Sequence, residues 1–136
     1  MAGQAYSPGM RITSLDHLVL TVADTGATVA FYERLGMRAE TFGQGRLALH
    51  FGDQKINLHQ AGAEFEPRAL HPLPGSADLC FLVEGSLGDV ALALGESGVA
   101  IELGPVEREG AAGVLESLYV RDPDGNLVEL SRALSG

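Results

Sequence analysis

The hydrophobic pattern begins with a segment of alternating character, ITSLDHLVLTVA, that starts at Ile12 and is rich in β-branched residues. Such a segment is typical of a β-strand. Asp24 follows as a suitable N-cap for a helix with apolar residues at helical spacing, and Gly36 ends that helix. Three short segments with strand patterning come next, at about residues 37–42, 46–51 and 54–60.

The same order of elements then repeats. After a connection rich in glycine and proline, ADLCFLVEG predicts a strand, and a second helix is expected over about residues 87–97, ended by Gly98. Strands are expected near residues 99–103, 114–121 and 127–132, the last two joined by a tight turn at DPDGN. The sequence thus predicts an α+β fold of two βαβββ modules, at about 12–60 and 77–134, within one domain of residues 12–136. Residues 1–11 are expected to form a mobile tail.

Aligning the two modules pairs His17 with Asp78, and Asn57 with Glu129. Side chains alternate across a strand, and each helix needs an apolar sheet surface beneath it. The apolar neighbours of these four residues supply that surface, so the four polar side chains are expected on the opposite, concave face. His59 shares the face of Asn57.

Imidazole, carboxylate and amide groups gathered on one face suit a divalent ion such as Mn²⁺, Fe²⁺, Ni²⁺, Zn²⁺ or Mg²⁺. Two or three protein ligands would leave coordination positions open for a substrate with two oxygens. The alternative is that these residues are simply solvated, as on most half-exposed antiparallel sheets, and that the histidine is structural.

Composition narrows the function classes. The chain has 136 residues and a formal net charge of −9, which disfavours nucleic-acid and acidic membrane partners. No apolar run is long enough to cross a bilayer and no signal peptide is evident, which predicts a cytoplasmic protein. Cys80 is the single cysteine and lies in an apolar run, where a buried, inert thiol is expected. Sequence motifs of hydrolases, zinc proteases and phosphate-binding loops are missing.

Three segments resemble one family. LDHLVLTVAD followed by FYERLGM, and the later VRDPDGNLVELS, are similar to the first and last strands of vicinal oxygen chelate proteins, the glyoxalase, bleomycin-resistance and dioxygenase superfamily. The resemblance covers about Ile12 to Leu134. The run FGDQKINLHQAGAEFEPRALHPLPGSADLC resembles more specifically the glyoxalase-domain-containing protein five subgroup. The resemblance implies paired βαβββ modules that form a cleft.

The resemblance also implies a divalent metal held by residues of the first, fifth and last strands. His17 and Glu129 match the first and last positions in residue type, whereas Asp78 stands where many members have histidine. Asn57 stands where glyoxalase I has glutamate, which argues against glyoxalase I activity. His59 is a candidate catalytic base or fourth ligand, or packs against the loop that follows it.

In small members of this family the ligands meet at a dimer interface. The resemblance therefore implies a homodimer with two equivalent sites.

Four further residues are candidates for substrate binding. They are Asn57, Arg68, Arg108 and Tyr119. Arg68 in the proline-rich connection suits a substrate carboxylate or phosphate, although it is equally expected to be a solvated loop arginine. Residues 104–113 are expected to form a mobile lid in which Arg108 contacts an anion. Tyr119 faces the cleft in one strand register and not in the other.

Two functions of different class follow. The first is a metal-dependent lyase, isomerase, dioxygenase or transferase that chelates a small substrate through adjacent oxygens, with His17, Asp78 and Glu129 as ligands. The second is a metal-free protein of bleomycin-resistance type that sequesters a ligand. The net charge of −9 would suit a cationic ligand, and Asp78 in place of histidine favours this second reading.

Overall fold

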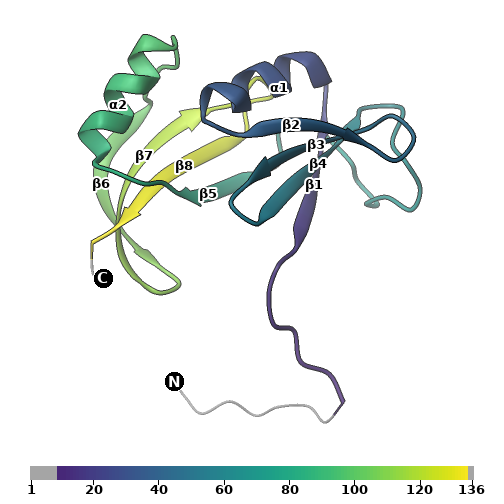
Figure 1. Cartoon of the computed structure of the whole chain (residues 1–136), viewed down its shortest axis with the longest axis horizontal. Helices are drawn as coiled ribbons and strands as arrows, with labels where there is room; N and C mark the ends of the chain where they lie inside the picture. Colours follow the sequence, from purple (N-terminus) through teal and green to yellow (C-terminus); the bar gives the residue numbers. More distant parts are fainter. Residues whose placement is uncertain (1–8, 135–136) are drawn as a thin grey trace.

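A computed structural model describes residues 9–134. The first module contains β1 (His17–Val22), α1 (Thr25–Arg34), β2 (Arg38–Phe42), β3 (Arg46–Phe51) and β4 (Gln54–Gln60). The second contains β5 (Asp78–Leu82), α2 (Leu87–Glu96), β6 (Leu103–Gly110), β7 (Gly113–Arg121) and β8 (Leu127–Ala133). The predicted α+β fold of two βαβββ modules is confirmed (Figure 1). The tail predicted at residues 1–11 lies, apart from its last three residues, outside the described residues.

The two modules form two sheets of the same topology. The strand orders are β1-β4-β3-β2 and β5-β8-β7-β6, and in each sheet the first strand runs parallel to the last strand of its module. Val19 lies beside Asn57 in the first sheet, and Cys80 lies beside Glu129 in the second. The pairing of Asn57 with Glu129, inferred from alignment of the modules, is therefore confirmed by the strand register.

Local sequence explains where the helices begin and end. The Asp24 carboxylate accepts a hydrogen bond from the Ala27 amide at 3.1 Å, and the Ser86 hydroxyl accepts one from the Asp89 amide at 3.1 Å. Each side chain satisfies an amide that has no partner within its helix. Gly36 and Gly98, which follow the helices, adopt positive φ angles of 95° and 80°.

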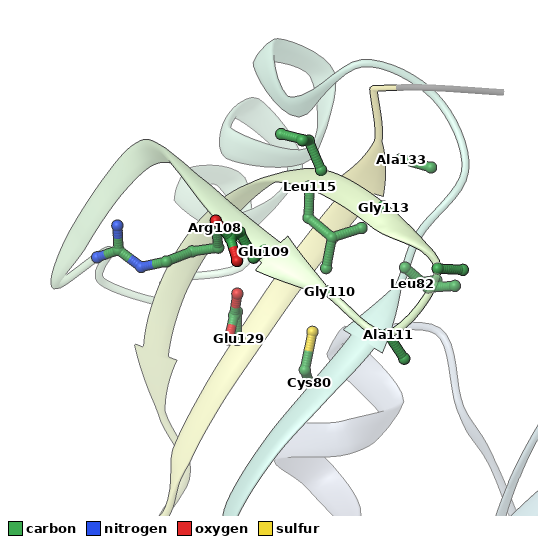
Figure 2. Close-up of a pocket in the computed structure, with 12 residues that line it drawn as sticks. Cys80, Leu82, Arg108, Glu109, Gly110, Ala111, Gly113, Leu115, Glu129 and Ala133 are labelled. Atoms are coloured by element: carbon green, nitrogen blue, oxygen red, sulfur yellow. The ribbon is translucent and has the colours of Figure 1, made fainter. Parts of the chain in front are cut away.

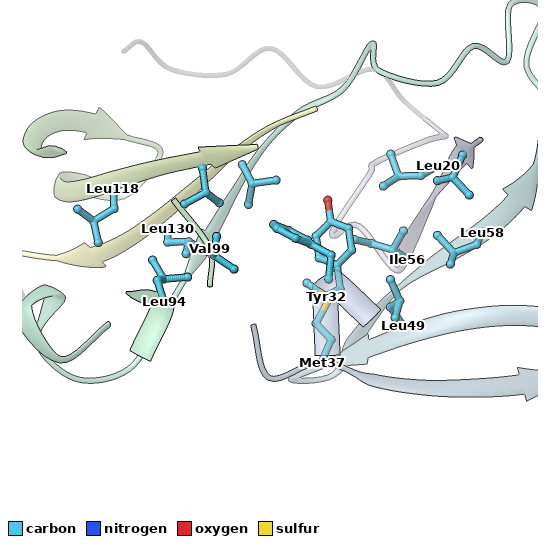
Figure 3. Close-up of a cluster of buried hydrophobic side chains, with 14 of the residues drawn as sticks. Leu20, Tyr32, Met37, Leu49, Ile56, Leu58, Leu94, Val99, Leu118 and Leu130 are labelled. Atoms are coloured by element: carbon cyan, nitrogen blue, oxygen red, sulfur yellow. The ribbon is translucent and has the colours of Figure 1, made fainter. Parts of the chain in front are cut away.

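One hydrophobic core joins the modules (Figure 3). Val22, Tyr32 and Leu49 from the first module and Leu118 and Val128 from the second are all fully buried in it. The apolar residues expected beneath the helices occupy this core, so the assignment of strand faces is confirmed. The polar members of the same strands consequently lie on the opposite faces.

The DPDGN turn fastens the second module to the first. The Tyr32 hydroxyl of α1 donates to Asp122 Oδ2 at 2.8 Å, and Asp124 Oδ1 accepts from the Ala23 amide at 3.1 Å. Within the second module, Asn126 Oδ1 accepts from the Ala77 amide at 2.8 Å, which anchors the turn. The turn therefore has a structural role that its composition alone did not reveal.

The structure corrects three expectations drawn from the sequence. The strand predicted near residues 99–103 and the lid predicted at 104–113 are wrong, because β6 spans Leu103–Gly110 and forms a hairpin with β7. A register shift between Leu103 and Val106 accommodates Gly104, so the glycines permit pairing instead of preventing it. The first strand begins only at His17, and Ile12 is 87% exposed.

No helix in residues 9–134 combines the length and apolar character needed to span a membrane.

Candidate metal and ligand site

Glu129 is held in place by two serine hydroxyls on the concave face of the second sheet. Ser117 Oγ donates to Glu129 Oε2 at 2.6 Å, and Ser131 Oγ donates to the same oxygen at 3.3 Å. Both serines are fully buried and lie 2.7 Å apart, oxygen to oxygen. Among residues 9–134, Oε1 receives no hydrogen bond. The carboxylate is thus oriented through one oxygen while the other stays available, as in carboxylates whose orientation is fixed for metal binding.

Cys80 lies beside Glu129 on the same face. The expectation of a buried thiol is wrong, because Cys80 is exposed and lines a cavity, with its sulfur 3.3 Å from Ser131 Oγ. Partial burial of the sulfur still raises the pKa of the thiol. The charges of Glu129 and Asp78 raise it further, while the Ser131 hydrogen bond opposes them. A thiol with a raised pKa is a poor nucleophile, so an unreactive role for Cys80 still follows.

The cavity that contains these groups has a volume of about 440 Å³. It lies between β5, β8 and the β6–β7 hairpin, and Figure 2 shows Cys80 and Glu129 on adjacent strands beneath that hairpin. Apart from Glu129, Glu109, Arg108 and Cys80, its lining residues are glycine, alanine, leucine and valine. Leu82 at its rim is 71% exposed.

Tyr119 faces this same side of the sheet. It lies directly opposite Glu129 in the antiparallel pairing of β7 and β8, and side chains of directly opposed residues share a face. The register that the sequence left open is therefore resolved. Arg108 Nε donates to the Tyr119 hydroxyl oxygen at 3.0 Å, so the phenol proton is available to another acceptor.

His17 begins β1 on the concave face of the first sheet. Its Nδ1 lies 2.7 Å from Asp16 Oδ1, and its side chain is 43% exposed. A histidine fixed through Nδ1 presents Nε2 outward, which is the usual arrangement of a ligating imidazole.

Asp78 begins β5 at the equivalent place on the second sheet and is exposed. Within the described part of the chain, no group of three His, Cys, Asp or Glu side chains is close enough to hold a metal ion.

Asn57 and His59 lie deeper on the first sheet. Asn57 Oδ1 is buried and has no hydrogen-bond partner among the described residues. His59 is 9% exposed and meets the Phe65 ring edge-on at 5.7 Å, so it packs against the loop, which was one of its two expected roles. Arg68 shares a cavity of about 240 Å³ with His59, while its Nε is paired with Glu66 at 2.8 Å.

Two cations on the first sheet were missed by the sequence reasoning. The Arg46 guanidinium lies 4.5 Å from the centre of the Phe65 ring, and the Lys55 ammonium lies 4.0 Å from that of Phe42. Lys55 precedes Asn57 by two residues, and the alternation rule that placed Asn57 would also have placed Lys55.

Paired βαβββ modules with polar concave faces define a class of protein, and comparison with known sequences identifies it. The pattern of the Glyoxalase/Bleomycin resistance protein/Dioxygenase superfamily matches residues 14–130. The chain belongs to this superfamily, which is the family that its strand motifs resemble.

Two relatives are similar over most of this chain. The glyoxalase domain-containing protein RDO1 of Mycosarcoma maydis is 57% identical over 90% of this chain and 69% of its own length. The virulence protein STM3117 of Salmonella typhimurium is 56% identical over 90% of this chain and 86% of its own length. The crystal structure of STM3117 matches with a TM-score of 0.90, at 55% identity, over 92% of this chain and 100% of that one.

More distant solved structures share the fold alone. Lactoylglutathione lyase from Agrobacterium tumefaciens has 22% identity and a TM-score of 0.68, over 90% of this chain and 95% of that one. TnmS3, an antibiotic-binding protein from Streptomyces, has 23% identity and a TM-score of 0.70, over 91% of this chain and 98% of that one. A lyase and a binding protein thus share this scaffold, so the fold does not decide the function.

Proposed function

We propose that this protein is a metal-dependent enzyme of the glyoxalase and dioxygenase type, acting on a small substrate with adjacent oxygens. The observation that carries the proposal is the state of Glu129, whose Oε2 is held by two buried serines while Oε1 is left available. Glu129 lines the cavity, so the oxygen that the serines leave unbonded is open to a metal ion bound there. His17 is arranged in the same way, because Asp16 holds its Nδ1 and leaves Nε2 available.

His17, Asp78 and Glu129 supply nitrogen and oxygen donors, which fit a divalent ion that prefers such ligands to thiolates. His17 belongs to the first sheet and the two acids belong to the second. We therefore propose a homodimer in which His17 of one subunit meets Asp78 and Glu129 of its partner. This arrangement gives two equivalent sites related by a twofold axis.

The residues beside the proposed ligands can assist the reaction of a bound substrate. A bound metal would supply Lewis-acid chemistry for the two oxygens of a substrate. The Tyr119 hydroxyl accepts a hydrogen bond from Arg108 and lies opposite Glu129, so its proton can be donated to a substrate oxygen. Arg108 thereby orients the phenol, and the apolar walls of the cavity exclude water from the reacting oxygens.

Calorimetric titration of chelator-stripped protein with Mn²⁺ tests the metal. Saturable binding is expected for the wild type and is expected to be lost in His17→Ala and Glu129→Ala. His71→Ala and Glu96→Ala are matched controls, since both residues are exposed and neither is a proposed ligand, and both variants should bind as the wild type does. Binding that survives in His17→Ala and Glu129→Ala, or no binding by the wild type, refutes the metal site.

A mixing experiment tests the dimer. If each site takes His17 from one subunit and Glu129 from the other, a heterodimer of the two alanine variants contains one intact site. Random exchange makes about half of the dimers mixed, so about one quarter of the wild-type number of sites should return. No recovery after exchange would refute the shared site while leaving metal binding itself standing.

A second function is favoured by the apolar lining of the cavity over the second sheet, which suits sequestration of a ligand without metal. The calorimetric titration distinguishes the two, because a sequestering protein needs no divalent ion.

A further inference from the structure

The basic side chains are distributed unevenly, and several lie where acidic partners are missing. The chain carries 18 acidic and 9 basic residues. Arg38, Arg68, Arg121 and Arg132 each form an ion pair with a glutamate. Within the range 9–134, no ion pair is formed by Arg34, Arg46, Lys55 or Arg108, and of these Arg46 and Lys55 share one face of the first sheet. In a chain with twice as many acids as bases, two unpaired cations on one face need an explanation.

Both cations are held over the concave face of the first sheet by aromatic rings. Arg46 from β3 lies over Phe65, and Lys55 from β4 lies over Phe42 at the end of β2. Phe65 is itself fixed by its edge-on contact with His59. A cation that lies on a ring face keeps its other side open to an anion.

The floor between these cations is small and polar. Ala48 lies between Asn57 on one side and Glu40 on the other, as the strand register requires. Asn57 contributes a buried amide oxygen without a partner. Ala48 is fully buried, so neighbouring side chains already cover this position, and the unpartnered oxygen of Asn57 is an acceptor that adds nothing to the attraction for an anion. An anion would therefore meet the two cations above this floor.

The single acid of these strands is already neutralised. Glu40 accepts from Arg38 at 3.4 Å, which balances its charge, and it lies 3.0 Å from His50 Nε2. The face that contains Arg46 and Lys55 is therefore basic within an acidic protein.

We propose that Arg46 and Lys55 form a binding site for an anionic group, a carboxylate or a phosphate, of the ligand that enters the cleft. The planar guanidinium of Arg46 suits two oxygens of one such group, and the Lys55 ammonium acts as a point charge. This inference rests on the proposed function in one respect: it assumes that the ligand binds in a cleft formed by the concave faces. The site itself lies within one chain and requires no metal.

Titration of the ¹⁵N-labelled, metal-stripped protein with inorganic phosphate, and separately with malonate, tests the site. Saturable shifts are expected in amides of β3, β4 and Phe65. Arg46→Gln and Lys55→Gln should each weaken binding about tenfold, because each removes a charge-assisted contact. The probe that binds more tightly tells whether the natural anion is a phosphate or a carboxylate.

Arg34→Gln is the matched control, because Arg34 is an exposed arginine of α1 and loses the same charge. It should bind both probes as the wild type does. The inference is overturned if neither probe gives saturable shifts, or if Arg34→Gln weakens binding as much as Arg46→Gln, which would reveal a general effect of net charge. Mn²⁺ calorimetry on Arg46→Gln should give the wild-type affinity, so a failure of the anion site and a failure of the metal site are distinguishable. The amide spectrum of each variant verifies its fold.

Discussion

Replacing Tyr32 by phenylalanine removes the hydrogen bond that fastens α1 to the DPDGN turn. Tyr32 is fully buried, Asp122 is 5% exposed, and their oxygens lie 2.8 Å apart. A hydrogen bond to a charged group contributes about 1.5–3 kcal/mol to stability. Asp122 keeps three other donors, two backbone amides to Oδ1 and the Asn126 side chain to Oδ2. The carboxylate is thus not stranded, and the expected loss for Tyr32→Phe is about 1.5–2 kcal/mol at pH 7.

The same residue predicts a pH dependence. Burial raises the pKa of the Tyr32 phenol, and the neighbouring Asp122 carboxylate raises it further. Because the pKa is raised in the folded state, the stability that Tyr32 contributes is fully present below the ordinary phenol pKa. Above that pH the unfolded chain releases the phenol proton first, so this contribution to stability is lost as the pH rises. At a pH of about 11 the wild type should have lost about 1.4 kcal/mol through this residue, whereas Tyr32→Phe loses nothing through it. The free energies of unfolding of the wild type and Tyr32→Phe should therefore differ by less at about pH 11 than at pH 7.

Urea unfolding followed by circular dichroism, at pH 7 and at about pH 11, measures both effects. Tyr119→Phe is a suitable control, because it also removes a phenol but on the concave face, where Tyr119 bonds only Arg108 among the described side chains. It should change stability by less than about 0.5 kcal/mol. A comparably small effect for Tyr32→Phe at pH 7, or a difference that widens at high pH, would refute the role assigned to the turn.

Three further predictions concern the cleft and its frame. Ser117→Ala and Ser131→Ala should each lower Mn²⁺ affinity about 10–100-fold by calorimetry, because they release the Glu129 carboxylate. Gly104→Ala should destabilise the protein by about 1–3 kcal/mol in urea, since a Cβ would lie 2.4 Å from a backbone oxygen at a φ of +116°. Gly95→Ala, in α2 with open space around it, should instead stabilise by about 0.5 kcal/mol. Cys80 should react with iodoacetamide more slowly than free cysteine at pH 8, because its thiol pKa is raised.

Each of these has a contrary result. Unchanged Mn²⁺ affinity in both serine variants would mean that the hydroxyls do not orient a ligand. Equal stability of the two glycine variants would mean that the hairpin tolerates a side chain at its bulge. Labelling of Cys80 as fast as free cysteine would contradict the effect ascribed to burial and to Glu129.

The sequence was sufficient to predict those features that a single local rule determines. Along β1, apolar Leu18 and Leu20 alternate with His17 and Thr21, so the buried face could be told from the exposed one without any knowledge of the partner strands. Asp24 likewise marks its helix start, because an N-cap interaction spans only three residues. These features fixed the module boundaries and the concave face.

The sequence was insufficient where partners distant in the chain decide the structure. In β5 the alternation correctly sent Leu79 and Phe81 towards the core, but the burial of Cys80 was inferred from the apolar run around it, and the thiol is exposed on the opposite face. In β6, glycine, proline and charged residues disguise a strand whose existence depends on pairing with β7. The proposed ligand set also depends on partners distant in the chain, since His17 and Glu129 belong to different sheets.

Net charge is a further property that misleads when read over the whole chain. A charge of −9 suggests a cationic ligand, but a ligand in a cleft responds to charges within about 8 Å at physiological salt, and more distant ones are screened. On the first sheet those near charges are Arg46 and Lys55, with Glu40 already paired. The second sheet presents the carboxylates of Glu129 and Glu109 together with the single guanidinium of Arg108. A cleft built from both faces would therefore have the proposed anion site on one wall and, on the other, the proposed metal ligands Glu129 and Asp78. This division argues for a substrate whose anionic group and chelating oxygens lie at different ends.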